Sequence, residues 1–145
     1  MRMRSAVIVA LLVGMLSGAF AGGGLVLARE GDGADKVEAQ DLFVKDFAGD
    51  PSKEVKAQLY TFPPGSILPW HIHPDADEIA YVIEGTFTFQ RAGEQPKTMK
   101  QGEADYVAPN VVHHGMNLSD APVKLFVVRI KPKDKPLTEE VPAPQ

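Results

Sequence analysis

Short runs of β-forming residues, each closed by a turn signal, follow one another through most of the chain. Residues 55–62 alternate with a period of two, and the Pro63-Pro64-Gly65 triplet then forces a turn. Further runs, separated by clusters of Gly, Pro, Asn and Asp, lie at residues 66–73, 78–84, 86–91, 97–101, 104–108, 111–117 and 123–130. Because no long helical period interrupts them, the pattern predicts an all-β fold, either a sandwich or a closed barrel.

The N-terminal 28 residues have the three-part pattern of a signal peptide. A basic start is followed by an apolar run, and small residues at Ala19 and Ala21, or near Ala28, offer cleavage positions. An uncleaved N-terminal membrane anchor is the alternative, because residues 6–28 are just long enough to span a bilayer. Both interpretations place the folded domain outside the cytoplasm, so we expect an exported protein, either periplasmic or secreted.

The rest of the chain divides by composition into a lead-in, one domain and a tail. Residues 29–40 are charged and rich in glycine, which predicts a flexible lead-in. Residues 41–131 hold the β-rich runs and form a single predicted barrel domain. Residues 132–145 are rich in proline, so we expect an extended or frayed tail.

Charge and cysteine content exclude several classes of protein. The chain has 15 Lys and Arg against 19 Asp and Glu, a formal charge of −4. Removal of the first 28 residues leaves 13 basic and 19 acidic residues, a formal charge of −6. An acidic domain of this kind is poorly suited to bind nucleic acid through its phosphates. The absence of cysteine excludes disulfide scaffolds, thiolate metal sites and cysteine nucleophiles.

All four histidines of the chain fall in two short windows. His71 and His73 are two residues apart, so on a strand both imidazoles point to the same face. Glu78 follows after a turn and can bring its carboxylate back over the pair, and His113 can supply a third imidazole. Three imidazoles and one carboxylate form a mixed site that suits Mn, Fe, Ni, Cu or Zn. His114 lies on the opposite face and is not expected to be a ligand.

The spacing of these residues resembles that of a known family. Gly65, His71, His73, Glu78 and Gly85 match the first cupin motif, GX5HXHX4EX6G, at every fixed position. The stretch around the two histidines is similar to the corresponding box of germins, and the short spacing between motifs resembles small single-domain bacterial cupins.

A second cupin motif is matched more loosely. Gly102, His113 and Asn117 have the expected spacing, but Ala108 and Asn110 stand where the family usually has Pro and Gly. Asn is the residue best able to replace a Gly at positive φ, so the turn can be preserved.

The resemblance implies a fold and a metal centre. It implies a cupin-type antiparallel β-barrel, also described as a double-stranded β-helix or jelly-roll-like fold, which commonly forms a homodimer. His71, His73, Glu78 and His113 would hold one divalent transition metal per chain, with Fe, Mn or Ni expected first and Zn or Cu as alternatives. Glu78 would also be the catalytic carboxylate, acting as a base toward a small organic substrate.

Two classes of function are compatible with such a centre. The first is a small-molecule dioxygenase of the quercetinase kind, slightly favoured, or an oxalate-type decarboxylase or oxidase. The second is a metal-dependent protein that binds or senses a small ligand without turnover. No nucleic acid partner is expected, and contact with a membrane is expected only through an uncleaved N-terminus.

Four other residues receive more ordinary predictions. Tyr60 and Phe62 are expected in the wall of the cavity. Asn117 is expected to make a structural hydrogen bond in a turn, and Glu84 to be a solvated charge beside Gly85.

Overall fold

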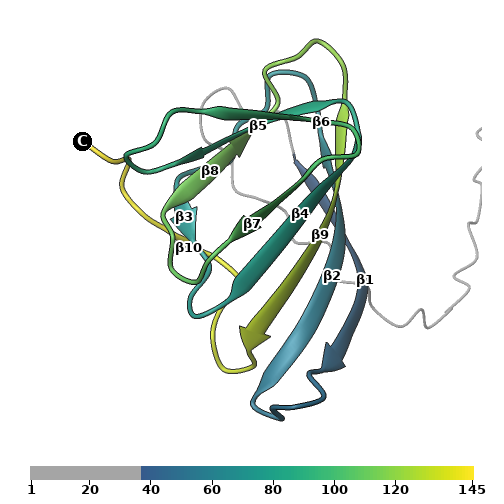
Figure 1. Ribbon diagram of the computed structural model, residues 1–145, viewed down its shortest axis with the longest axis vertical. Coiled ribbons are helices and arrows are strands. Elements are labelled where there is room, and N and C mark those ends of the chain that lie inside the picture. Colours follow the sequence, from purple (N-terminus) through teal and green to yellow (C-terminus); the bar gives the residue numbers. More distant parts are fainter. Residues whose placement is uncertain (1–36) are drawn as a thin grey trace, which may run out of the picture.

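Ten antiparallel β-strands in two facing sheets make up the part of the chain, residues 37–145, that this computed structural model describes (Figure 1). The long sheet has the order β1-β2-β9-β4-β7, and the short sheet has the order β10-β3-β8-β5-β6. The strands are β1 (Glu38–Asp46), β2 (Lys53–Phe62), β3 (His71–Ile72), β4 (Asp77–Glu84), β5 (Thr86–Arg91), β6 (Lys97–Lys100), β7 (Ala104–Val107), β8 (His113–Met116), β9 (Val123–Pro132) and β10 (Glu139–Glu140). The predicted all-β antiparallel fold is therefore confirmed.

The long sheet is built on an uninterrupted pairing of β2 with β9. Their register runs from Lys53 opposite Pro132 to Phe62 opposite Val123. Every second residue of β9, beginning at Val123, is buried, which is the alternation expected of a strand with one face toward a core. The inward set starts with aliphatic residues and ends with Arg129 and Lys131, so the interior changes from apolar to charged along this strand.

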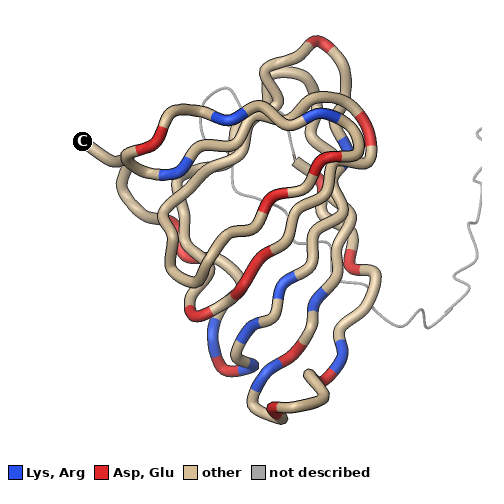
Figure 2. Tube along the Cα trace, in the orientation of Figure 1, with Lys and Arg blue, Asp and Glu red and all other residues tan. Residues whose placement is uncertain are grey.

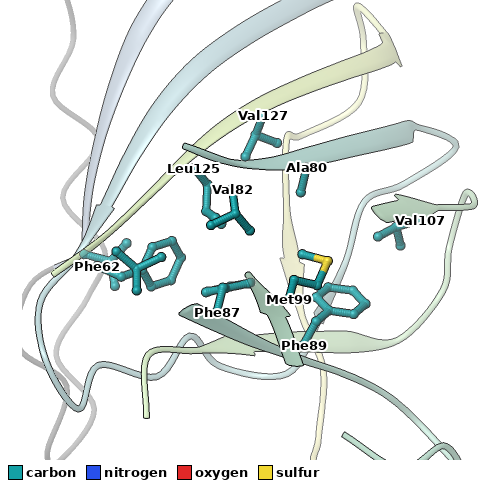
Figure 3. Close-up of a cluster of buried hydrophobic side chains, with 11 residues drawn as sticks. Phe62, Ala80, Val82, Phe87, Phe89, Met99, Val107, Leu125 and Val127 are labelled. Carbon is teal, nitrogen blue, oxygen red and sulfur yellow. The ribbon is translucent and has the colours of Figure 1, made fainter. Parts of the chain in front are cut away.

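The hydrophobic core lies between the two sheets. In Figure 3, Phe87, Phe89 and Met99 of the short sheet lie across from Val82, Leu125 and Val127 of the long sheet. Removing a side chain of this size from water stabilises the fold by roughly 1.5–3 kcal/mol. The core closes one end of the space between the sheets and leaves the other end for polar side chains.

A glycine on β8 allows the short sheet to pack tightly. A Cβ atom at Gly115 would lie 2.3 Å from Cζ of Phe87, closer than two carbon atoms can approach. Any larger residue would therefore require β8 or the buried phenyl ring to move. His113 lies two residues earlier on the same strand.

Two predictions about the segments need correction. A strand was expected at 66–73, but the structure has only β3 and an isolated bridge between Ile67 and Met116, because Pro69 lacks the N–H that a continuous ladder needs. β1 begins at Glu38, inside the expected lead-in, and forms an edge strand along β2. The tail was expected to be extended or frayed, and its β10 is an extended segment that pairs with β3.

Charges of both signs are interleaved along the long strands and at the turns (Figure 2). Between residues 37 and 145, no helix is long and apolar enough to cross a membrane. The predicted signal peptide or anchor at residues 1–28 lies outside the described residues.

Candidate metal centre

Three imidazoles converge between the sheets at the polar end of the interior. His71 on β3 lies opposite His113 on β8, and His73 follows the end of β3. Their side chains are 2–6% exposed, and one ring nitrogen from each lies within 4.8 Å of the others. These three residues could therefore hold one metal ion.

Hydrogen bonds fix which nitrogen of each ring faces the centre. Nδ1 of His71 lies 2.7 Å from the carbonyl oxygen of Pro69, and Nδ1 of His113 lies 2.7 Å from that of Val111. Nδ1 of His73 lies 2.6 Å from the carbonyl oxygen of Leu137. Because a carbonyl only accepts hydrogen bonds, each Nδ1 carries the proton, and each Nε2 of a neutral ring presents a lone pair.

The donor set fits a transition-metal ion. Among the described residues, Nε2 of His73 is a buried atom without a hydrogen-bond donor, and it lies 2.9 Å from Oε2 of Glu78. A lone pair and a carboxylate oxygen at this distance repel each other unless a proton or a cation lies between them. Burial lowers the pKa of His71 to about 3, so this ring is neutral at pH 7. Neutral imidazoles with their Nδ1–H groups bound to carbonyls are the usual form of metal-binding histidines.

Glu78 reaches the cluster from the long sheet. It lies on β4, is 5% exposed, and its Oε1 is 3.9 Å from Nε2 of His113. Burial raises the pKa of Glu78, but the charge of Arg129 and the neighbouring imidazoles lower it by more, so its net pKa lies well below the usual range. The structure thus brings together His71, His73, His113 and Glu78, with Glu78 as an ionised carboxylate.

Arg129 is a residue of this site that the sequence interpretation missed. Its Nε and Nη2 lie 2.7 and 2.6 Å from Oε2 of Glu78. Its Nη1 donates to Oε1 of Gln58 at 2.8 Å and to the hydroxyl of Tyr60 at 3.1 Å. Parity could have revealed it, because Arg129 shares the inward face of β9 with Val123, Leu125 and Val127.

A small cavity adjoins the imidazoles. Tyr60 and Phe62 both line it, which confirms the prediction for these two side chains. Its volume is about 30 Å³. Its lining combines the polar residues His71, Glu78, His113 and Arg129 with Leu68, Ala80, Phe87, Phe89, Gly115, Leu125 and Val127.

The fourth histidine is outside the cluster, as predicted. The ring of His114 stacks on Trp70 with 3.9 Å between centroids, and its Nε2 lies 3.2 Å from Oε1 of Gln90. Asn117 is fully buried and donates to the carbonyl oxygens of Phe62, Pro63 and Ala121, so its predicted structural role is also confirmed.

Asn110 takes the backbone conformation that its place in the second motif predicts. Its φ is 63°, and its side chain exchanges hydrogen bonds with Asp75, which has a φ of 52°. The two turns are thereby tied together beside His73, whose carbonyl oxygen accepts from the Asn110 N–H at 3.3 Å. Glu84 pairs with Lys124 at 2.8 Å on the exposed surface, which agrees with a solvated charge.

Comparison with known proteins gives a consistent result. Residues 58–129 match the model of the cupin domain. The auxin-binding protein ABP19b of Prunus persica is 27% identical over 107 residues, covering 71% of this chain and 51% of that protein. The chain therefore spans about half the length of the curated relatives it matches.

Solved structures show the same fold at low identity. A double-stranded β-helix domain protein from Klebsiella pneumoniae superposes with a TM-score of 0.61 at 18% identity, covering 79% of this chain and 90% of that one. An oxalate oxidase in complex with glycolate superposes with a TM-score of 0.53 at 23% identity, covering 60% of this chain and 46% of that one. From the matched domain, the two sheets and these structures, the chain belongs to the cupin superfamily.

Proposed function

We propose that this protein is a metal-dependent enzyme that acts on a small organic substrate bearing a carboxylate or enol oxygen. The observation that carries the proposal is the convergence of three Nε2 lone pairs beside an ionised carboxylate at the end of a cavity. Purely structural histidines do not need this arrangement, because their inward nitrogens would otherwise find donors. We propose His71, His73, His113 and Glu78 as the ligands.

The size of the cavity bears on the choice of chemistry. A cavity of about 30 Å³ is much smaller than the roughly 300–1,000 Å³ of a typical ligand pocket, so it suits a substrate of a few atoms, whereas a flavonol would require the walls to open. We therefore favour an oxalate-type oxidase or decarboxylase over a quercetinase-like dioxygenase. The oxalate oxidase that shares this fold was solved with glycolate, a ligand of suitable size, although the likeness itself concerns only the fold.

The protein's own groups have separable roles in this proposal. When bound, a divalent Mn, Fe or Ni ion supplies Lewis-acid and redox chemistry. Arg129 fixes Oε2 of Glu78 and keeps that carboxylate ionised. We propose Glu78 as the catalytic carboxylate, which takes a proton from the substrate once Arg129 has oriented it. Phe62, Phe87 and Phe89 give the same space apolar walls.

A binding protein without turnover is the second candidate. The observation in its favour is that the curated relatives are named auxin-binding proteins. A ligand protein of this kind would use the same imidazoles to hold a metal and would need no proton transfer at Glu78.

Turnover experiments distinguish these functions. Protein loaded separately with Mn²⁺, Fe²⁺ or Ni²⁺ is incubated with oxalate, glycolate or a flavonol, with and without oxygen. Oxygen uptake matched to substrate loss indicates an oxidase or dioxygenase, and carbon dioxide release without net oxygen uptake indicates a decarboxylase. Metal-dependent binding without turnover of any candidate would favour the second function.

Glu78→Gln is the matched variant for the catalytic role. It preserves size and one oxygen but removes the charge and the basic site, so a general base should lose roughly 100-fold or more in rate. Metal content should fall less than in His71→Ala. Unchanged turnover in Glu78→Gln would contradict the catalytic role of this carboxylate.

We also propose that the protein is exported through its N-terminal segment. The support is the signal-like sequence of residues 1–28. The intact mass of protein recovered from the exported fraction tests this proposal. A mature chain beginning near Gly22 or Arg29 is expected, and a full-length chain retained in the membrane would instead indicate an anchor.

A further inference from the structure

One of the three converging histidines is oriented by a distant part of the chain. For His71 and His113, the carbonyl that accepts the Nδ1–H group belongs to the residue two positions earlier. For His73 the acceptor is Leu137, which is 64 residues away in the sequence. Leu137 also lies beyond residues 58–129, the part of the chain that matches the cupin domain.

The C-terminal tail reaches His73 by a defined path. After β9 ends at Pro132, the chain turns back, and in Figure 1 it rises from the end of β9 to β10 beside β3. There Glu139 pairs with Ile72 and Glu140 pairs with His71. The N–H of Val141 donates to the carbonyl oxygen of Trp70 at 2.9 Å, which anchors the end of this segment.

The hydrogen bond from His73 to the tail is short and buried. Nδ1 of His73 lies 2.6 Å from the Leu137 oxygen, and the His73 side chain is 2% exposed. The hydroxyl of Thr138 lies 3.4 Å from the same nitrogen, at the limit of a hydrogen bond. Without Leu137, Nδ1 would turn toward water or exchange its proton with Nε2, and the lone pair would no longer be held toward the centre.

We propose that residues 136–141, the C-terminal strap, form a positioning element of the metal centre, acting through the Leu137 carbonyl on His73. The inference rests on the proposed metal centre and adds to it a segment outside the matched cupin domain. Outer hydrogen bonds to ligand histidines are typically worth about 10–100-fold in metal affinity. By linkage, bound metal strengthens the docking of the strap by the same factor as the strap strengthens metal binding.

The first test measures protons in the metal-free protein and so does not depend on metal binding. In ¹⁵N-histidine-labelled protein, NMR should show three buried rings protonated at Nδ1. A chain ending at Lys135 should lose the protected Nδ1–H signal of His73 and keep those of His71 and His113. Persistence of all three signals, or loss of all three together, would overturn the proposal, since neither result is specific to His73.

The second test measures metal affinity in the full-length parent, in the shortened chain and in two full-length variants at Val141. Val141→Pro removes the N–H that donates to Trp70, whereas Val141→Ala keeps it. With Zn²⁺ as the probe, the chain ending at Lys135 should bind about 10–100-fold more weakly than the parent. The Zn²⁺ affinity of Val141→Pro should lie between that of the parent and that of the shortened chain. The affinity of Val141→Ala should match that of the parent.

The two tests separate failure of the strap from failure of the metal centre. Equal Zn²⁺ affinity in the parent and in the shortened chain would overturn the proposal, as would equal loss in both Val141 variants. If the parent itself binds no Zn²⁺, Mn²⁺ or Ni²⁺, the proposed function fails, and the His73 signal still decides whether the strap orients that ring. Protection of the strap from carboxypeptidase by Zn²⁺ is the expected reciprocal effect, and no protection would contradict the linkage.

Discussion

The long sheet and the short sheet hold their buried polar groups in different ways. In the long sheet, Glu78 on β4 lies directly opposite Arg129 on β9, so a regular ladder places the carboxylate against its guanidinium partner. In the short sheet, His71 and His113 face each other across strands, and each of the three converging imidazoles is oriented by a carbonyl from a loop or from the tail. Changes in the long sheet should therefore affect fold stability first, whereas changes in the short sheet should affect metal binding.

The largest effect is expected from removing Arg129. Arg129→Met leaves the charge of Glu78 buried without its partner, and breaking a buried pair in this way costs about 3–5 kcal/mol. Urea unfolding of the metal-free protein, followed by the fluorescence of Trp70, measures the free energy of unfolding.

A double variant separates charge from packing at this position. Arg129→Met combined with Glu78→Gln removes both charges, so it should regain most of the lost stability. If Arg129→Met lowers the free energy of unfolding by less than about 1 kcal/mol, or if the double variant does not recover the loss, the inference that Glu78 needs Arg129 as its buried partner is contradicted.

The next largest effect concerns the imidazoles of the short sheet. His71→Ala and His113→Ala each remove a proposed ligand, so metal affinity should fall by more than the roughly 10–100-fold expected for an outer hydrogen bond. His114→Ala is the matched control, because its ring stacks on Trp70 outside the cluster. Elemental analysis and titration with Zn²⁺ check this prediction, and loss of metal in His114→Ala alone would contradict it.

The same contrast explains which parts of the site could be predicted from sequence. His71, His73, Glu78 and His113 follow a fixed spacing, and strand parity correctly assigned His114 to the other face. Arg129 was missed although the alternation along β9 contained the signal, since a charged residue at an inward position needs a buried partner.

The hydrogen bond from His73 to Leu137 had no comparable signal. It depends on the direction in which the tail turns after Pro132, and a proline-rich composition does not encode that direction. β1 was missed for a similar reason, because the side chains of this edge strand are largely exposed and lack the alternation of a strand with one buried face.

A pH effect of intermediate size is expected in the metal-free protein. Burial lowers the pKa of His71 to about 3 and also lowers that of His113, so the unfolded chain binds protons that the folded chain excludes. The free energy of unfolding should therefore fall as the pH drops below the ordinary histidine value of about 6.5, by up to about 1.4 kcal/mol per pH unit for each ring. Glu78 adds a loss of the same sign below its unfolded pKa of about 4.5, because its folded pKa is lowered.

Urea unfolding at a series of pH values measures this slope. His71→Ala should flatten it between pH 6.5 and pH 4. His114→Ala should change it less, since burial alone lowers the pKa of His114, whereas the neighbouring His113 adds to the lowering of the pKa of His71. A stability that is constant over this range would show that the imidazoles titrate in the folded state as they do in water.

The smallest effect on the free energy of unfolding is expected from a substitution on the outer face of the long sheet. Comparing it with a substitution on the inner face of β4 shows how the two faces of one strand differ. A row of apolar residues crosses all five strands of this face, and three of its members are 44–52% exposed. In cross-strand order the row is Phe43, Ala57, Val128, Ile79 and Tyr106. If a second copy of the chain packs on this face, it covers these side chains.

Two threonine substitutions on β4 test both statements. Val82 is fully buried in the core, so Val82→Thr places a hydroxyl where it lacks a partner and should cost about 1–3 kcal/mol. Ile79→Thr lies on the outer face and should change the stability of the isolated chain by no more than about 0.5 kcal/mol. If the outer face forms a homodimer, however, Ile79→Thr should weaken association in sedimentation experiments, because burial of this side chain then contributes to the interface. Unchanged association in Ile79→Thr would show that this face is not the dimer interface. A polar side chain in the middle of an apolar row weakens any interface that buries the row.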